Sequence, residues 1–258
     1  MSMSLAALPR ELCWALNARV RQPWSATGVQ DQAAKFLAQL LRVNRGEHQS
    51  PRWERDYLQR SQWFDRRCSD FFAQHPKGLC IDLGAGLSTR FHRLSQQADW
   101  PCFRWVDVDL PSVIALKSGV MPAIDNYQLI SANFLQDDWL AQVNWLPHEP
   151  IIITLEAVLA GVSERKIERL LACLLAQLNA CKAFDSSPCI RLVFDISAPP
   201  NGMKRWFGRV LGGGLHSLLT RLDSIGLKIL SAEVLPGHAA WGLVTELNCT
   251  TKNKRSLG

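Results

Sequence analysis

The chain has 258 residues, of which 47% are hydrophobic and 20% are charged, and its net charge at pH 7 is +6. This composition is that of a soluble globular protein and excludes wholesale disorder, and the length suits one large α/β domain with or without an appended lid. No apolar run approaches the roughly 20 residues of a membrane span. The N-terminal "MSMSLAALPRELCWAL" lacks the basic start and long apolar core of a signal peptide.

The eight cysteines form no Cys-x-x-Cys pair, and several fall inside apolar runs. A zinc site needs convergent, closely spaced ligands, so we predict no metal and free thiols in a reducing cytoplasm. The positive charge is spread through the first seventy residues and the "KNKR" tail. It fits an anionic substrate or nucleic acid, but acids scattered among the arginines argue against nucleic acid. We predict a cytoplasmic protein with no nucleic-acid or membrane partner.

The first seventy residues predict helices and loops. "DQAAKFLAQLLRV" has apolar residues at the spacing of one helix face, and "WERDYLQRSQWFDRRCSDFFAQH" predicts a second helix. From residue 78 onward, short apolar runs alternate with helical stretches. We therefore expect a helical lid over residues 1–70, an α/β domain over 71–250 and a basic tail over 251–258.

Seven runs predict strands: "GLCIDLGAG", "CFRWVDVDL", "YQLISANF", "EPIIITLEAV", "CIRLVFDIS", "LKILSAEVL" and "WGLVTELNC". Helical stretches separate the first five, which predicts a mostly parallel, doubly wound sheet covered on both faces. Only "PGHAA" joins the last two, which predicts an antiparallel hairpin at one edge. "SERKIERLLACLLAQLN" predicts a helix between the fourth and fifth strands, with Ser163 as its N-cap. This Rossmann-like strand inventory is that of the class I methyltransferase fold.

Ligands of such sheets bind at the carboxyl ends of the strands. The first strand ends at Gly84-Ala85-Gly86, where small residues let a ligand approach the backbone closely. By itself this turn is equally compatible with a plain tight turn. The second strand ends at Asp109, which is 25 residues beyond Gly84, near the spacing of an acid that holds ribose hydroxyls.

The next two strands also end in candidate ligands. Asn133 could read an adenine edge and Phe134 could pack on it. Glu156 is an acid in an apolar run, so it needs a cationic or donor partner. A third glycine of a dinucleotide motif is absent after Gly86, which disfavours pyrophosphate and favours a nucleoside cofactor such as S-adenosylmethionine (SAM).

These residues together resemble the leucine carboxyl methyltransferase family, whose bacterial branch includes enzymes of natural-product tailoring. The resemblance covers roughly residues 55 to 198. "LQRSQWFD", "LGAGLSTR", "WVDVDLPSVIALK", "ISANFLQDDW" and "LEAVLAGVSERKIERLL" are similar to family motifs, in the same order and at matching spacings.

The resemblance implies SAM-dependent O-methylation, with S-adenosylhomocysteine (SAH) as the product. Arg60 would pair with the carboxylate of SAM, and Gly84 and Gly86 would pass close to its methionine part. Asp109 would hold the ribose, and Glu156 would face the amino end. The implied cofactor-binding set is completed by Ala85, Leu110, Asn133 and Phe134.

The sequence departs from the family pattern at Ser88 and Asn133, where the family has Asp, and at Gln62, where it has Arg. Further departures border the expected substrate position: Ala157, Ala160 and Gly161. They put the choice of substrate in doubt. A second hypothesis is therefore a SAM-binding regulatory or partner protein without transferase activity.

The implied acceptor is the carboxylate of a small, anionic and partly apolar molecule, which needs no general base because it is already ionised. For this reason no catalytic residue is assigned. A hydroxyl acceptor is the alternative, and it would make His92, His148 or His238 the candidate bases. The lid and the segment after the fifth strand would close the substrate pocket, with Lys204, Arg205 and Trp206 contacting the acceptor.

Overall fold

The computed structural model describes residues 9–21, 31–44, 46, 48–96, 102–146, 148–160, 162–181, 189–197, 217–235 and 240–247. Lys204, Arg205, Trp206, Gly161, His238 and the basic tail lie outside these ranges.

Seven strands form one sheet in the order β3-β2-β1-β4-β5-β7-β6. The strands are β1 (Leu79–Leu83), β2 (Arg104–Asp109), β3 (Tyr127–Ser131), β4 (Ile151–Leu155), β5 (Ile190–Ser197), β6 (Leu227–Val234) and β7 (Ala240–Leu247). The first five pair in parallel, and β7 pairs antiparallel with both β5 and β6. The predicted doubly wound sheet with a terminal antiparallel hairpin is confirmed, and the last strand lies between β5 and β6.

The two central strands are buried on both faces, which explains why they read as continuous apolar runs. Successive residues of β1 point to opposite faces of the sheet. Leu79, Ile81 and Leu83 pack in the cluster with α6 (Glu164–Ala180), and Cys80 packs in the cluster with α3 (Pro51–Gln74). Asp82 therefore lies on the α3 face, in an otherwise aromatic and aliphatic layer.

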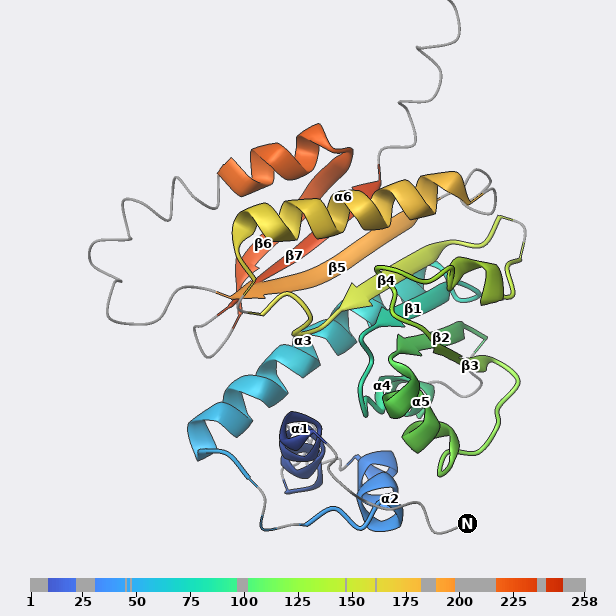
Figure 1. Ribbon diagram of the computed structural model, residues 1–258, viewed down its shortest axis with the longest axis vertical. Helices are drawn as coiled ribbons and strands as arrows, with labels where there is room; N and C mark the ends of the chain where they lie inside the picture. The colour runs from blue at the N-terminus through green and yellow to red at the C-terminus, as the bar shows by residue number, and fades with distance from the viewer. Residues whose placement is uncertain are drawn as a thin grey trace, which may run out of the picture.

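Helices cover both faces of the sheet, as the parallel pairing requires. One face carries α6 and the helical residues 217–224, drawn in orange beside it in Figure 1. The other carries α3 and α4 (Arg90–Ser95), which contribute Phe64, Phe71 and Phe91 to the core. Ser163 occupies the N-cap position of α6 as predicted, but its side chain makes no capping hydrogen bond.

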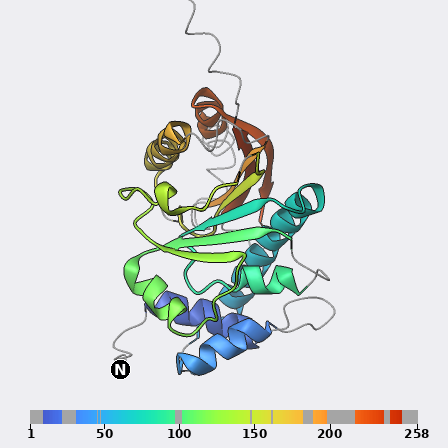
Figure 2. The same ribbon diagram turned by 90° about the vertical axis from the view of Figure 1, so that its right-hand side faces the viewer.

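The N-terminal helices α1 (Arg10–Arg21) and α2 (Gln32–Leu40) lie together at the end of the molecule opposite α6 (Figure 1 and Figure 2). They share an apolar cluster that includes Leu16, Leu37 and Ala38, and this cluster continues onto Leu87 in the turn after β1. These helices thus pack against the turn in which the sequence predicted a ligand site. Helix α5 (Pro111–Ser118) begins directly after β2 and lies against β2 and β3.

Candidate functional site

A cavity of about 430 Å³ lies where α1, α3, the turn after β1 and the turn after β4 meet. The strand order reverses between β1 and β4, so the cavity lies at the topological switch point, where open α/β sheets bind ligands. Its lining includes five predicted cofactor contacts: Arg60, Gly84, Ala85, Gly86 and Glu156. Four others lie outside its lining: Asp109, Leu110, Asn133 and Phe134.

The backbone of the turn after β1 requires glycine. Gly84 has φ +69° and Gly86 has φ +53°, in the left-handed region that side chains disfavour. A Cβ on Gly84 would lie 2.7 Å from Cγ2 of Val158, and one on Gly86 would lie 3.0 Å from Cδ2 of Leu12 on α1. The absence of both side chains keeps the turn close to its neighbours and leaves its backbone exposed to the cavity.

Asp109 closes this turn from the neighbouring strand. Its carboxylate accepts hydrogen bonds of 2.6 Å from the backbone amides of Gly86 and Leu110. A carboxylate has about four acceptor positions, so further donors can still bind it. Asp107, the other acid of β2, is buried among Trp105, Lys117 and Tyr127 and is fully engaged with them. Asp107 is thus part of the core, and Asp109 is the acid of β2 that borders the site.

Asn133 and Phe134 make contacts within their own segment. The side-chain oxygen of Asn133 accepts a hydrogen bond of 3.2 Å from the amide of Leu135. Phe134 packs against the core, and its carbonyl accepts a hydrogen bond of 3.1 Å from the indole of Trp139. Leu110 is 49% exposed at the start of α5. The predicted contact of these residues with an adenine stays a prediction.

Arg60 and Glu156 line the cavity as an ion pair. The Nε atom of Arg60 lies 3.7 Å from Oε1 of Glu156, and among the described residues neither atom has a hydrogen-bond partner although both are buried. An unpaired buried donor and acceptor are costly unless a ligand binds them. The ammonium and carboxylate of an amino acid would satisfy this pair, so the methionine part of SAM fits it.

Glu156 is also held by Arg90, a fully buried arginine in the motif "LGAGLSTR". Arg90 donates to Oδ1 of Asp65 and to Oδ2 of Asp82, both at 2.9 Å. Such a buried arginine is stable only because carboxylates surround its planar group. Sequence reasoning used the glycines of this motif and missed its arginine.

Asp195 at the carboxyl end of β5 is a second acid that sequence reasoning missed. Its Oδ2 lies 4.0 Å from Nε of Arg60, and its Oδ1 accepts a hydrogen bond of 2.6 Å from the amide of Ala157. Burial raises the pKa of Asp195 to about 6, although Arg60 opposes the shift. The signal that identified Glu156, an acid near the end of an apolar strand, was also present in "CIRLVFDIS".

Tyr57 forms the aromatic wall of the cavity. Its ring stacks on Trp53, with centroids 5.4 Å apart, and the guanidinium groups of Arg19 and Arg60 lie 5.8 Å and 5.7 Å from its centroid. Burial raises the pKa of Tyr57, so the phenol remains protonated and can donate a hydrogen bond. Its oxygen accepts a bond from Arg19.

Ser88, which replaces the Asp of the family pattern, lines the cavity. Its hydroxyl accepts a 3.3 Å hydrogen bond from the amide of Arg90, so it supports the start of α4. Ala157 and Ala160 line the opposite side.

The two candidate histidine bases that lie in the described ranges are not in this cavity. His92 lines a separate apolar cavity with Phe36, Phe91 and Met121, and burial lowers its pKa to about 4. His148 is exposed in the loop that precedes β4, at the other end of that strand.

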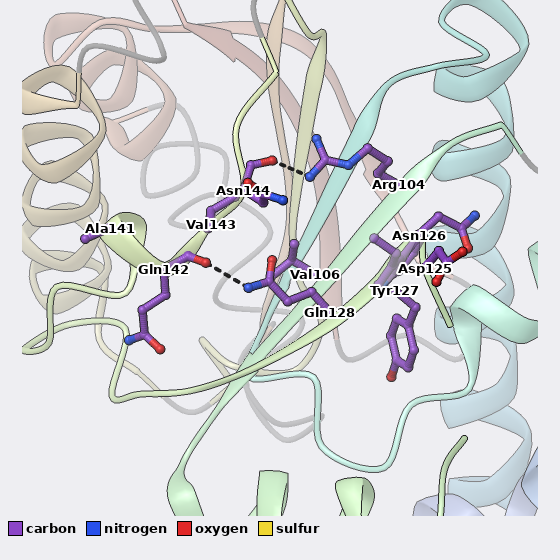
Figure 3. Close-up of a pocket in the computed structure, with 11 residues that line it drawn as sticks. Arg104, Val106, Asp125, Asn126, Tyr127, Gln128, Ala141, Gln142, Val143 and Asn144 are labelled. Atoms are coloured by element: carbon purple, nitrogen blue, oxygen red, sulfur yellow. Dashed lines mark hydrogen bonds between the residues drawn. The ribbon is translucent and has the colours of Figure 1, made fainter. Parts of the chain in front are cut away.

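A further cavity of about 420 Å³ lies at the amino ends of β2 and β3. There Arg104 donates to the carbonyl of Asn144, and Gln128 donates to the carbonyl of Gln142 at 2.7 Å (Figure 3). These bonds tie the segment 141–144 to the sheet. The polar side chains of this cavity therefore serve to anchor the loop to the sheet. The cavity lies away from the switch point.

Comparison with known proteins assigns the family. The family model of leucine carboxyl methyltransferase matches residues 15–175, which is more than half of the chain. The chain belongs to the leucine carboxyl methyltransferase family. This confirms the predicted membership in a family of SAM-dependent methyltransferases.

Two relatives bear on the match. The chain is 32% identical over 113 residues to the tetracenomycin polyketide synthesis O-methyltransferase TcmP of Streptomyces glaucescens, a match that covers 43% of this chain and 40% of TcmP. The chain thus spans well under half of the length of this curated relative. A solved structure from Thermobifida fusca, assigned as a methyltransferase, aligns with a TM-score of 0.55 over 92% of this chain and 94% of that one, at 12% identity. This likeness supports the fold.

Two observations on the described residues concern metal sites and membrane-spanning helices. In the described ranges, no group of three or more His, Cys, Asp or Glu side chains is arranged to hold a metal ion. Within the same ranges, no helix is long and apolar enough to cross a membrane.

Proposed function

We propose that this protein transfers a methyl group from SAM to the carboxylate of a small, anionic and partly apolar molecule, forming a methyl ester. The observation that carries the proposal is the Arg60–Glu156 ion pair beside the glycine turn at the switch point, whose buried Nε and Oε1 atoms have no hydrogen-bond partner among the described residues. The similarity to TcmP, an O-methyltransferase of tetracenomycin polyketide synthesis, supports a natural-product intermediate as the acceptor.

The residues of this chain bind and orient the reactants. Arg60 would hold the carboxylate of SAM, Glu156 its amino group and Asp109 its ribose, while Gly84 and Gly86 allow close approach. We also propose that Ala85, Leu110, Asn133 and Phe134 complete the cofactor site. When bound, SAM supplies a methyl group activated by its positively charged sulfur. The gain in rate then comes from alignment of the reactants and exclusion of water.

The cavity lining favours a carboxylate acceptor over a hydroxyl. A hydroxyl must lose a proton, which calls for a base with a pKa near neutrality. Histidine is absent from the lining among the described residues, and Tyr57 is a phenol whose pKa is raised. Burial raises the pKa of Asp82, which also lines the cavity, to about 6, but its two oxygens already accept hydrogen bonds from Arg90 and Thr154. An ionised carboxylate needs no base and is attracted to Arg19 and Arg60. We further propose that residues 1–70 act as a lid on the 71–250 domain, and that Lys204, Arg205 and Trp206 contact the acceptor.

Ligand-induced thermal stabilisation tests the cofactor assignment. SAM and SAH should raise the melting temperature of the wild type, and Arg60→Ala or Asp109→Ala should reduce this shift severalfold. Arg52→Ala, an exposed position on the same helix α3, is the matched control and should keep the full shift. A wild type that neither ligand stabilises would disprove the assignment, and a tight SAM complex without methyl transfer to any tested acid would favour the binding-protein hypothesis.

A labelling experiment tests the acceptor class. With SAM that carries a radioactive methyl group, a methyl ester releases its label as methanol in mild base, whereas a methyl ether retains it. Base-labile product would support the carboxylate acceptor, and base-stable product would establish the hydroxyl alternative.

A further inference from the structure

Nine ionised side chains form one continuous, largely buried chain of ion pairs behind the cofactor site. Its order is Asp195, Arg60, Glu156, Arg90, Asp65, Arg93, Asp31 and Arg19, with Asp82 as a branch at Arg90. The distance between charged atoms is 2.9 Å for Arg90 and Asp65 and reaches 4.0 Å for Arg60 and Asp195. This set of ion pairs, called the ionic chain below, runs from β5 to α1. It contacts each element on the α3 side of the sheet that borders the site.

The ionic chain contains five carboxylates and four guanidinium groups. It therefore carries one negative charge in excess when all its members are ionised. Most of its side chains are no more than 7% exposed, so solvent screens this charge weakly. A buried net charge is costly unless a counter-charge is bound nearby.

The excess charge lies beside the cavity. Asp195 and Glu156 both lie at Arg60, so this arginine has two carboxylate neighbours at one end of the ionic chain. Asp195 has a side chain that is only 2% exposed. Burial raises the pKa of Asp195 to about 6, and it raises the pKa of Asp82, the branch at Arg90, to about 6 as well.

SAM and SAH differ in net charge because methyl transfer converts the positively charged sulfonium of SAM into the uncharged thioether of SAH. SAM has a sulfonium, an ammonium and a carboxylate, for a net charge of +1, and SAH has lost the sulfonium charge, for a net charge of zero. The excess charge of the ionic chain is equal and opposite to that of SAM, and SAH leaves it uncompensated.

We propose that Asp195 is a specificity-determining residue of the cofactor site, which favours cationic SAM over the product SAH through the negative charge it adds to the ionic chain. This inference rests on the proposed function. Asp195 acts on the bound cofactor through its electrostatic field in the cavity and through its contact with Arg60. Selection of SAM over SAH at this site would weaken product inhibition.

Asp195→Asn tests the charge while it preserves shape, because the amide oxygen can still accept the hydrogen bond from Ala157. The groups that face Asp195 are Arg60 on α3, Glu156 after β4, the amide of Ala157 and the uncharged Gly242 that pairs with it on β7. The substitution leaves four carboxylates against four guanidinium groups. Glu149→Gln is the matched control: Glu149 is a buried acid with a raised pKa that pairs with Arg104 outside the site.

Calorimetric titration of the purified full chain with SAM and with SAH gives the measurement. In Asp195→Asn, SAM affinity should fall roughly tenfold while SAH affinity changes much less, since the effects of a buried unit charge on the ammonium and carboxylate of SAH oppose each other and SAM carries the additional sulfonium charge. Near pH 6, in two buffers of different ionisation enthalpy, SAM should release more protons than SAH from the wild type, and the variant should show a smaller difference, since Asp82, whose pKa is also about 6, remains. Glu149→Gln should keep the wild-type affinity ratio and proton release.

An equal loss of affinity for both ligands in Asp195→Asn would overturn the inference, since it would mean that Asp195 only positions Arg60. Unchanged affinity for both would overturn it as well. Either result leaves the proposed function in place. Failure of the wild type to bind SAM or SAH would reject the proposed function itself.

Discussion

Ala157 holds a backbone conformation that is costly for a residue with a side chain. Its φ is +61°, and its amide is fixed by Asp195, whose buried carboxylate it approaches at 2.6 Å. The family pattern has glycine here. The left-handed conformation is therefore imposed by the turn after β4, and the alanine bears the strain.

Replacement of Ala157 by glycine should stabilise the protein by about 1 kcal/mol, because relief of the strain outweighs the added freedom of the unfolded chain. The free energy of unfolding in urea is the measurement. Ala160→Gly, in the same turn but without a positive φ, is the control and should destabilise slightly. A loss of stability in both variants would contradict the assigned strain.

At the scale of elements, the N-terminal helices α1 and α2 are attached to the rest of the protein through buried charges as well as apolar contacts. Asp31 is the N-cap of α2, and its Oδ1 accepts a hydrogen bond of 2.8 Å from the amide of Ala34. Its Oδ2 accepts hydrogen bonds of 2.6 Å from Thr89 and 3.0 Å from Arg93, both of the α4 region. One side chain thus starts α2 and binds it to the domain.

Asp31→Ala should therefore destabilise the protein by about 3 kcal/mol, since it removes a cap and leaves part of Arg93 unpaired in a buried position. Hydrogen exchange should show faster exchange of the α2 amides, while those of the central strand β4 keep their protection relative to global unfolding. Ser50→Ala removes the N-cap of α3 without touching the ionic chain, and it should cost only about 1 kcal/mol. Equal losses in the two variants would show that the ionic contacts of Asp31 add nothing.

For the whole molecule, buried ionisable groups set the pH dependence of stability. Burial raises the pKa of Asp195 to about 6 from its ordinary value of 3.8, so the folded state retains this proton more strongly than the unfolded state. The resulting stabilisation is full below about pH 4 and is lost as the pH rises through about 6. His92 acts in the opposite direction, because burial lowers its pKa to about 4 and the unfolded state takes up the proton.

A comparison of Asp195→Asn with the wild type isolates one of these groups. Between pH 5 and pH 8 the wild type should lose on the order of 1 kcal/mol that the variant does not lose. The free energy of unfolding of the variant, minus that of the wild type, should therefore rise over this range in the absence of ligand. Urea unfolding at both pH values is the measurement, and a pH-independent difference would contradict the raised pKa.

The sequence allowed most of the fold to be predicted. Seven apolar runs, alternating with helical stretches, predicted the sheet. Six of them contain an observed strand, and β7 matches the seventh except that it begins one residue earlier, at Ala240. The position of β7 between β5 and β6 was not predicted, because a hairpin pairs its two strands without deciding which one joins the sheet. Helix α3 continues to Gln74, past the predicted lid boundary at residue 70, because its aromatic residues pack on the sheet. That boundary stays a prediction.

Residue order alone determined the family motifs, the glycine turn and the strand-end acids Asp109 and Glu156, since each depends on local spacing along the chain. Only the tertiary structure revealed the buried ionic chain, because its partners are distant in sequence. Arg90 and Glu156 are 66 residues apart, and Arg93 and Asp31 are 62 apart. Whether an acid is solvated or buried against an arginine depends on what packs over it. The charge of the cofactor site was therefore decided by folding.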